Sequence, residues 1–184
     1  MLFMRFFRLA SLLTLLGLSL ILLSHRATAQ AWLFSTLPAL KAGAAPPELP
    51  ANTRALDGSP VTLTALRGKV VLLHFWTFAC GNCEHMLPSY AAFDGKYRAR
   101  GLRVIGVHTP ELAHERDMGR LRTFVAEKRI GWTVVPDAGY LVWDAFGVRA
   151  WPTCFVIGRD GKILASFVGD ESADDIEQRI VAAL

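Results

Sequence analysis

The clearest pattern along the chain is a nearly continuous apolar run from Val70 to Trp76, in which His74 is the one polar residue. A strand with one face in water alternates apolar and polar residues. A continuous run that begins with β-branched residues is instead typical of a strand covered on both faces. A second run of this kind extends from Leu102 to Val107. The pattern therefore predicts two central strands of a sheet that has helices on each side.

Helical periodicity follows each of these strands. From Cys83 to Arg100, apolar residues recur at helical spacing, namely Met86, Leu87, Tyr90, Phe93 and Tyr97. Within Met118 to Lys128, the same spacing holds for Leu121, Phe124 and Val125. Such spacing places one apolar face against a sheet. The order strand, helix, strand, helix predicts an α/β domain with a parallel core.

The rest of the chain predicts further strands and helices around this core. In chain order these are a strand at 133–135, a helix at 140–146, a strand at 151–157, an antiparallel strand at 163–168 and a helix at 170–184. Nearer the N-terminus, the turn pair Asp57-Gly58 lies between two short apolar runs and predicts a β-hairpin over 56–63. The expected architecture is a central mixed β-sheet flanked by helices, with an N-terminal β-hairpin extension.

The N-terminus has the composition of an export signal. Arg5 and Arg8 precede an uncharged stretch from Leu9 to Leu23, and the small residues Ala27 and Ala29 suit cleavage by a signal peptidase. The apolar stretch is shorter than the roughly 20 residues that span a bilayer, which favours a cleaved signal peptide over a retained membrane anchor. Both alternatives predict a periplasmic or other extracytoplasmic location, in the second case tethered to the inner membrane.

These patterns divide the chain into three regions. Residues 1–29 are expected to be a signal peptide or membrane anchor, residues 30–50, rich in Ala, Leu and Pro, an extended linker, and residues 51–184 one globular domain. The net charge is +4, but three of the 20 Lys and Arg lie in the first 26 residues, where there is no acid. The other 17 nearly balance the 16 acidic residues. A nearly neutral domain without a basic cluster excludes nucleic acid as an expected partner.

Cys80 and Cys83 form a C-x-x-C motif where the first strand meets the helix that follows it. A bridge across so short a loop adds little stability, so the pair is expected to serve chemistry. Free N–H groups and the dipole at a helix N-terminus stabilise a thiolate, which makes Cys80 the expected nucleophile. Cys83, about one turn along, is expected to be more buried and to resolve a mixed disulfide. The motif predicts a redox-active Cys80–Cys83 disulfide that needs no cofactor and no metal.

A second candidate part of the site is Trp151-Pro152-Thr153. A proline at the mouth of a strand interrupts the hydrogen-bond ladder, often through a cis peptide bond. The neighbouring backbone groups are then expected to pair with an extended substrate segment beside Cys80. Trp76 and Trp151 flank the expected active-site surface, so these two side chains and Thr153 are the candidate substrate contacts.

Together, these segments resemble thioredoxin-like proteins of the TlpA, ResA and DipZ type, which are exported thiol-disulfide oxidoreductases of bacteria. Leu63–Leu72 resembles the entry to the family's central strand, and Phe75–Thr77 leads into the C-x-x-C motif as it does in the family. Val104–Glu111 and Trp143–Val148, with Trp151-Pro152, are most similar to the C-terminal thioredoxin-like domain of DipZ.

This resemblance implies a thioredoxin fold, with Cys80 as nucleophile, Cys83 as resolving thiol and a cis-proline at Pro152. It also implies protein disulfides or dithiols as substrates, and a separate membrane protein that donates reducing equivalents. The resemblance favours reduction of extracytoplasmic protein disulfides. The residues of the motif alone leave the direction of the reaction open, because direction depends on the reduction potential.

Three residues near the motif each allow two interpretations. His74 stands where many thioredoxins have a buried Asp, so it is either a catalytic proton relay or a core histidine with one hydrogen bond. Cys154 is either an inert core thiol or a partner in an alternative disulfide. Glu111, after a turn at the end of a parallel strand, is either a proton-handling group or a solvated loop acid.

Two other functions use the same residues. Thr77-Phe78-Ala79-Cys80 is similar to the Thr-x-x-Cys of peroxidases on this fold, but Leu73 stands where the proline of that motif is expected. A copper-handling protein that is not an enzyme would use the dithiol and a histidine such as His85 or His108 as soft ligands.

Overall fold

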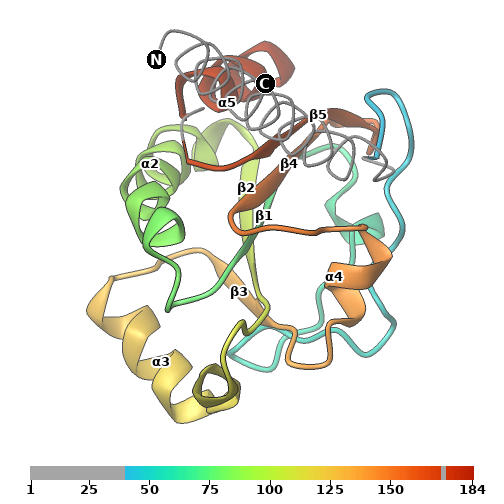
Figure 1. The fold of residues 1–184 in the computed structure, drawn as a ribbon. Coiled ribbons are helices and arrows are strands. Elements are labelled where there is room, and N and C mark those ends of the chain that lie inside the picture. The colour runs from blue at the N-terminus through green and yellow to red at the C-terminus, as the bar shows by residue number, and fades with distance from the viewer. Residues whose placement is uncertain (1–39, 171–172) are drawn as a thin grey trace, which may run out of the picture. The chain divides into compact units, whose positions relative to one another are not determined.

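The computed structural model describes residues 40–170 and 173–184. Its centre is a five-stranded sheet in the order β3-β2-β1-β4-β5 (Figure 1). The strands are β1 (Val70–Trp76), β2 (Leu102–His108), β3 (Thr133–Pro136), β4 (Thr153–Ile157) and β5 (Ile163–Val168). β1, β2 and β3 run parallel, whereas β4 is antiparallel to both β1 and β5. The sheet is therefore mixed, as the sequence predicts.

Helices cover both faces of this sheet. They are α2 (Gly81–Tyr97), α3 (Met118–Glu127), α4 (Leu141–Ala145) and α5 (Ala173–Ala183), with short 3-10 helices η1 (Thr64–Leu66), η2 (Arg98–Arg100) and η3 (Ala113–Arg116). Apolar side chains of α2, α3 and α5 form one core cluster with the sheet. α4 and the chain before β1 form a second cluster on the opposite face (Figure 1). The continuous apolar character of β1 and β2 follows from this double cover.

Alternation along β1 divides its side chains between the two clusters. Val70, Leu72 and Trp76 belong to the cluster under α2, and Phe75 belongs to the cluster under α4. All seven residues of β1 are buried. The predicted α/β architecture and each of the predicted strands and helices after residue 69 are confirmed, with bounds that differ by a few residues.

The N-terminal β-hairpin predicted over 56–63 is wrong in extent. The structure has a turn there, closed by an isolated antiparallel bridge between Arg54 and Pro60, and no strand on either side. The backbone N–H of Leu56 instead donates to the carbonyl of Val134 in β3, at 2.7 Å. The segment therefore closes a turn on itself and also pairs with the edge of the main sheet.

The linker predicted over 30–50 is also too long. Gly43 and Ala44 exchange backbone hydrogen bonds with Ile163, and Leu49 is buried in the cluster under α4. The carboxylate of Glu48 accepts hydrogen bonds from the backbone of Leu63 and Thr64 at η1. Proline prevents helix in this segment but does not prevent an extended chain from packing on a sheet. The last part of the predicted linker therefore belongs to the domain.

The predicted signal segment, residues 1–29, lies outside the described residues. Among residues 40–170 and 173–184, no helix has the length and apolar character needed to cross a membrane.

Sheet topology brings several chain segments to one edge. Because β1 and β2 are parallel and β4 is antiparallel to β1, the C-terminal ends of β1 and β2 meet the N-terminal end of β4. Phe75 is opposite Thr153, and Trp76 is opposite His108. The C-x-x-C motif, which follows β1, therefore lies at the same edge as Pro152.

Candidate active site

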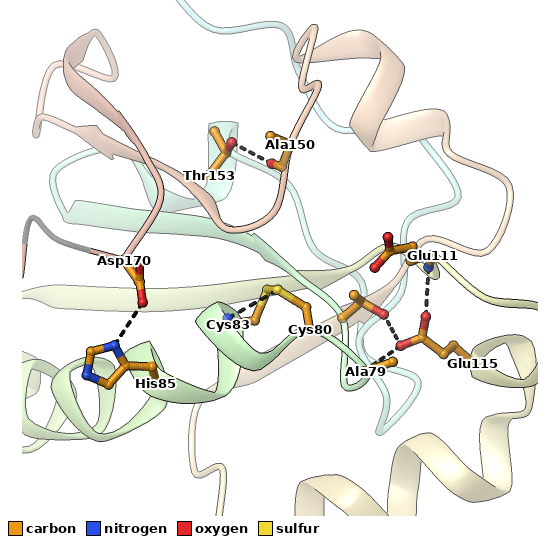
Figure 2. Close-up of a disulfide and its surroundings, with 10 residues drawn as sticks. Ala79, Cys80, Cys83, His85, Glu111, Glu115, Ala150, Thr153 and Asp170 are labelled. Carbon is orange, nitrogen blue, oxygen red and sulfur yellow. Dashed lines mark hydrogen bonds and ion pairs between the residues drawn. A yellow bond between two sulfur atoms is a disulfide. The ribbon is translucent and has the colours of Figure 1, made fainter.

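Cys80 is the N-cap of α2 and Cys83 lies in its first turn, as predicted. The two are joined by a disulfide, with their Cα atoms 5.2 Å apart (Figure 2). Cys80 is partly exposed, whereas Cys83 is 1% exposed. The backbone N–H of Cys83 donates to Sγ of Cys80 at 3.2 Å. A donor at a helix N-terminus aimed at sulfur stabilises a thiolate, so Cys80 combines access with activation.

The segment leading into Cys80 is held by a buried acid, Glu115 of η3. Its Oε1 accepts hydrogen bonds from the hydroxyl of Thr77 and, at 2.9 Å, from the backbone N–H of Ala79. Its Oε2 accepts from the backbone N–H groups of Glu111 at 2.8 Å and Leu112 at 2.7 Å. One carboxylate thus ties the loop after β2 to the loop after β1 (Figure 2).

Glu115 stays ionised although its side chain is 1% exposed. Burial by itself acts to raise the pKa of this carboxyl. The hydrogen bonds from Thr77, Leu112, Ala79 and Glu111 outweigh that effect, and the pKa is lowered from its usual range. A buried negative charge therefore lies next to the chain segment that presents the dithiol.

An aromatic cluster lies beneath this loop. Phe78 stacks on His108 with ring centroids 5.3 Å apart, and the ring of Trp76 meets His108 edge-on at 5.1 Å. Burial lowers the pKa of His108 to about 4, against an opposing effect of the Glu115 charge. Trp76 is 1% exposed, so the prediction that its side chain contacts substrate is wrong. A residue that lies between two covered faces of a sheet has no open surface.

His74 lies in the middle of β1, fully buried beneath α2. Its Nε2 accepts a hydrogen bond from Nε1 of Trp132 at 3.0 Å, and its ring lies against Tyr90 with centroids 4.3 Å apart. Nδ1 has no hydrogen-bond partner among the described residues. Burial lowers the pKa of this imidazole to about 3, so it is neutral at physiological pH. This environment is that of a core histidine with one hydrogen bond; its relay role stays a hypothesis.

The Trp151–Pro152 peptide bond is cis. The carbonyl of Pro152 accepts a hydrogen bond from the backbone N–H of Gly169 at 2.9 Å. Thr153 is buried, and its hydroxyl donates to the carbonyl of Ala150 at 2.7 Å (Figure 2). The Thr153 side chain is therefore closed to substrate, and the predicted contact of this residue with substrate stays a prediction.

Trp151 remains a candidate contact. Its side chain is partly exposed and packs on Trp143 with ring centroids 4.3 Å apart. Its backbone N–H and C=O make no hydrogen bond to any residue within 40–170 or 173–184. Of the three contacts predicted, this is the residue with free backbone groups at the edge of the sheet.

Cys154 is the free cysteine of the described residues. It is buried in β4, opposite His74 of β1. Burial raises the pKa of its thiol to about 12, against a smaller effect of a hydrogen bond with Tyr90. The thiol is thus essentially uncharged at neutral pH, in agreement with an inert core cysteine.

Glu84 and His85, in the first turns of α2, contact residues of other elements across the surface. Glu84 forms an ion pair with Lys128 beyond the end of α3. Nδ1 of His85 lies 2.9 Å from a carboxylate oxygen of Asp170, which follows β5 (Figure 2). In the part of the chain that the structure describes, no group of three or more His, Cys, Asp or Glu side chains could hold a metal ion.

Glu115 was not a candidate on sequence grounds. The acid that sequence reasoning singled out after β2 was Glu111, which is exposed and contributes its backbone N–H to Glu115. The exposed side chain of Glu111 agrees with the second of its two interpretations, a solvated loop acid. Only the fold of the loop decides which acid turns inward.

Comparison with known proteins supports the chemistry of this site. The model of the AhpC/TSA family matches residues 42–166. The thiol-disulfide oxidoreductase ResA of Bacillus anthracis is 30% identical over 122 residues, which is 66% of this chain and 68% of ResA. The protein DipZ of Mycobacterium tuberculosis is 38% identical over 104 residues, which is 56% of this chain. This chain spans only 13–15% of the length of the first curated relatives that it matches.

A solved structure has the same fold. A Chlorobium tepidum protein assigned as thiol:disulfide interchange protein DsbE is 32% identical, with a TM-score of 0.70. The match covers 78% of this chain and 98% of that protein.

Proposed function

This chain belongs to the AhpC/TSA family, and from that premise we propose that it is an extracytoplasmic thiol-disulfide oxidoreductase that reduces protein disulfides through Cys80 and Cys83. Its relatives named ResA and DipZ agree with the resemblance expected from the sequence. The observation that carries the proposal is the dithiol geometry, with an accessible Cys80 capping α2 and a buried Cys83 within disulfide distance.

The reaction takes two exchange steps. The thiolate of Cys80 attacks one sulfur of a substrate disulfide; a bond forms between these sulfurs and the substrate releases its other sulfur as a thiolate. Cys83, once deprotonated, then attacks Sγ of Cys80 and releases the second substrate thiolate. The substrate gains two electrons, and the protein is left with the Cys80–Cys83 disulfide. A second dithiol must reduce this disulfide before the next cycle.

The backbone of Trp151 is the proposed docking point for substrate. In the 150–153 segment, the carbonyl of Pro152 is taken by Gly169 and the carbonyl of Ala150 by Thr153. The N–H and C=O of Trp151, which have no partner among the described residues, can therefore pair with an extended substrate segment, as at an open sheet edge. Backbone pairing would hold many substrates beside Cys80 without requiring one sequence.

The proposed location outside the cytoplasm rests on the pattern of residues 1–29, with Arg5 and Arg8 before an uncharged stretch. A membrane dithiol protein is the proposed electron donor, since the chain itself carries one reactive pair. N-terminal sequencing of the chain from fractionated cells tests the location. A start at Gln30 in the periplasmic fraction is expected for a cleaved signal, and an intact N-terminus in the cytosol would contradict export.

Cysteine variants test the activity. We expect the wild-type chain to reduce a protein disulfide such as that of insulin, and Cys80→Ser to lower the rate by more than about 100-fold. Cys83→Ser should accumulate a mixed disulfide between Cys80 and substrate. Cys154→Ser is the matched control, because its thiol is buried away from solvent, and it should retain activity. Equal losses in Cys80→Ser and Cys154→Ser would contradict the assignment.

The direction of the reaction is tested by equilibration with glutathione. A reductant should have a potential well below the roughly −120 mV of strongly oxidising enzymes, and a value near that figure would reverse the assignment.

The peroxidase alternative is weakened by the position of Thr77. The Thr77 hydroxyl donates to Glu115, so its proton is not directed at the sulfur of Cys80. Peroxide turnover that is lost in Cys80→Ser but kept in Cys83→Ser would favour the alternative.

A further inference from the structure

The buried carboxylate of Glu115 contacts residues 77–79, the segment that leads into Cys80. Residues 77–79 connect the end of β1 to the N-cap of α2, and two of these three residues donate to Oε1 of Glu115. The other oxygen is held by Glu111 and Leu112 of the loop after β2. The carboxylate therefore fixes the Cys80 segment to a second loop of the same edge.

The donor set requires a carboxylate. Four donors converge on two oxygens, two on each, so both ends of the side chain must accept. A glutamine has one accepting end, and its NH₂ group would face two donors. An unsatisfied buried donor costs about 1–3 kcal/mol, so the substitution would shift the loop until those donors found other partners.

The charge of Glu115 differs from the other charges near the dithiol. The titratable and charged residues on the elements that form this edge are Glu84 and His85 on α2, His108 on β2, Glu111, His114 and Arg116 in the loop and η3, Lys128 after α3, Asp137 after β3, Arg149 before β4 and Asp170 after β5. Glu84 is exposed and forms an ion pair with Lys128, and the exposed ring of His85 contacts the carboxylate of Asp170. Within the described residues, Glu115 is held by dipoles and has no cation within salt-bridge distance, so its charge is weakly screened.

We propose that Glu115 is a positioning residue of the dithiol: it fixes Thr77 and Ala79 so that Cys80 meets the substrate disulfide correctly, and its charge limits ionisation of Cys80. The inference rests on the proposed function and assigns to it a residue that touches neither substrate nor sulfur. The two effects have opposite signs. Loss of the carboxylate removes a like charge and favours the thiolate, while it loosens the segment and slows exchange.

The test is Glu115→Gln, with Glu111→Gln as the matched control. The Glu111 side chain is exposed, and only its backbone N–H donates to Glu115. The control therefore removes a nearby negative charge and keeps all four hydrogen bonds to Glu115. Two quantities are measured: the pH midpoint of iodoacetamide alkylation of Cys80 in a Cys83→Ser background, and kcat/KM for insulin reduction with Cys83 intact.

In Glu115→Gln we expect the midpoint to fall by about 0.5–1 pH unit and kcat/KM to fall by about 10-fold. Glu111→Gln should leave kcat/KM within about twofold of wild type and the alkylation midpoint within about 0.2 pH unit of it. A midpoint that stays at the wild-type value or rises, or an equal fall in the control, would overturn the proposal.

A second variant serves if Glu115→Gln does not fold. Thr77→Val keeps shape and the carboxylate charge but removes one donor. We expect kcat/KM to fall by about threefold with no fall in the midpoint, and an unchanged kcat/KM would count against positioning. Failure of the proposed function can be told apart from failure of this inference. A wild-type chain that does not reduce insulin contradicts the function, whereas the effect of Glu115→Gln on the alkylation midpoint of Cys80 can still be measured.

Discussion

Two ionisable side chains lie buried close to β1, and one of them is charged whereas the other is neutral. Glu115 lies beyond the C-terminal end of the strand, and His74 lies in its middle. The pKa of each group is lowered, for different reasons. Four hydrogen bonds keep the Glu115 carboxylate charged, whereas desolvation, opposed by no acceptor, keeps the His74 imidazole neutral at a pKa of about 3.

The difference comes from the backbone around each residue. Mid-strand, the N–H and C=O groups beside His74 are committed to ladders with Gly106 and Cys154, so its ring finds one donor, the indole of Trp132. Past the strand ends, the N–H groups of Ala79, Glu111 and Leu112 have no ladder partner and converge on Glu115. A buried charge is maintained where strands end, because free donors are found there.

The largest expected effect is the loss of folding stability when the charged side chain, Glu115, is removed. Glu115→Ala leaves three backbone N–H groups and the Thr77 hydroxyl without their acceptor, so we expect the free energy of unfolding to fall by about 3 kcal/mol. Urea denaturation at pH 7.5 measures it, with Glu111→Ala expected within about 0.5 kcal/mol of wild type. A loss below about 1 kcal/mol would mean that water replaces the carboxylate and that the two sites differ less than argued.

The next effect concerns the packing of the neutral member. A Cβ added to Gly106 of β2 would lie 2.8 Å from Nε2 of His74 and 2.8 Å from Nε1 of Trp76. Both rings are buried and cannot turn away, so Gly106→Ala should lower the free energy of unfolding by about 2 kcal/mol. Gly95→Ala in α2 is the control: no atom would lie within 4 Å of its Cβ, and a gain of up to about 1 kcal/mol is expected. Equal stabilities for the two variants would show that His74 is loosely packed.

The smallest effect is a pH dependence that separates the two groups. The unfolded chain binds a proton at His74 near its ordinary value of 6.5, whereas the folded chain does so only near 3. Stability from this group is therefore complete above about pH 6.5 and is lost as pH falls toward 3. Above about pH 5.5 the loss comes from His74 and not from Glu115, because the stabilisation by Glu115 is lost only as pH falls through the ordinary carboxyl value of 4.5 toward its lowered folded pKa.

His74→Gln, which keeps an acceptor for Trp132, should shrink the stability difference between pH 7.5 and pH 5.5 by about 1 kcal/mol. His108 keeps its own share of the difference, since its folded pKa is about 4. Urea denaturation at the two pH values measures the change, and an unchanged difference would indicate that His74 is protonated in the folded chain.

The sequence predicts those parts of the fold that local patterns decide. The apolar run of β1, the helical spacing of α2 and the junction at Cys80 are all readable within about 30 residues. Glu115 is not, because its partners Thr77 and Ala79 lie 38 and 36 residues away. The burial of Trp76 and of Thr153 depends on distant segments in the same way. Trp76 packs against His108 of β2 and Phe124 of α3. Thr153 pairs with Phe75 of β1 and with Val168 of β5.

The depth of Cys154 has a consequence for how the chain tolerates oxidants. Three cysteines allow three possible disulfides, and a peroxide or an oxidised partner selects among them by thiolate content and access. With its pKa raised to about 12, Cys154 offers almost no thiolate for sulfenic acid formation or for scrambling. The folded chain can therefore pass through an oxidising medium with a spare thiol and still close one pairing, the one that its chemistry uses.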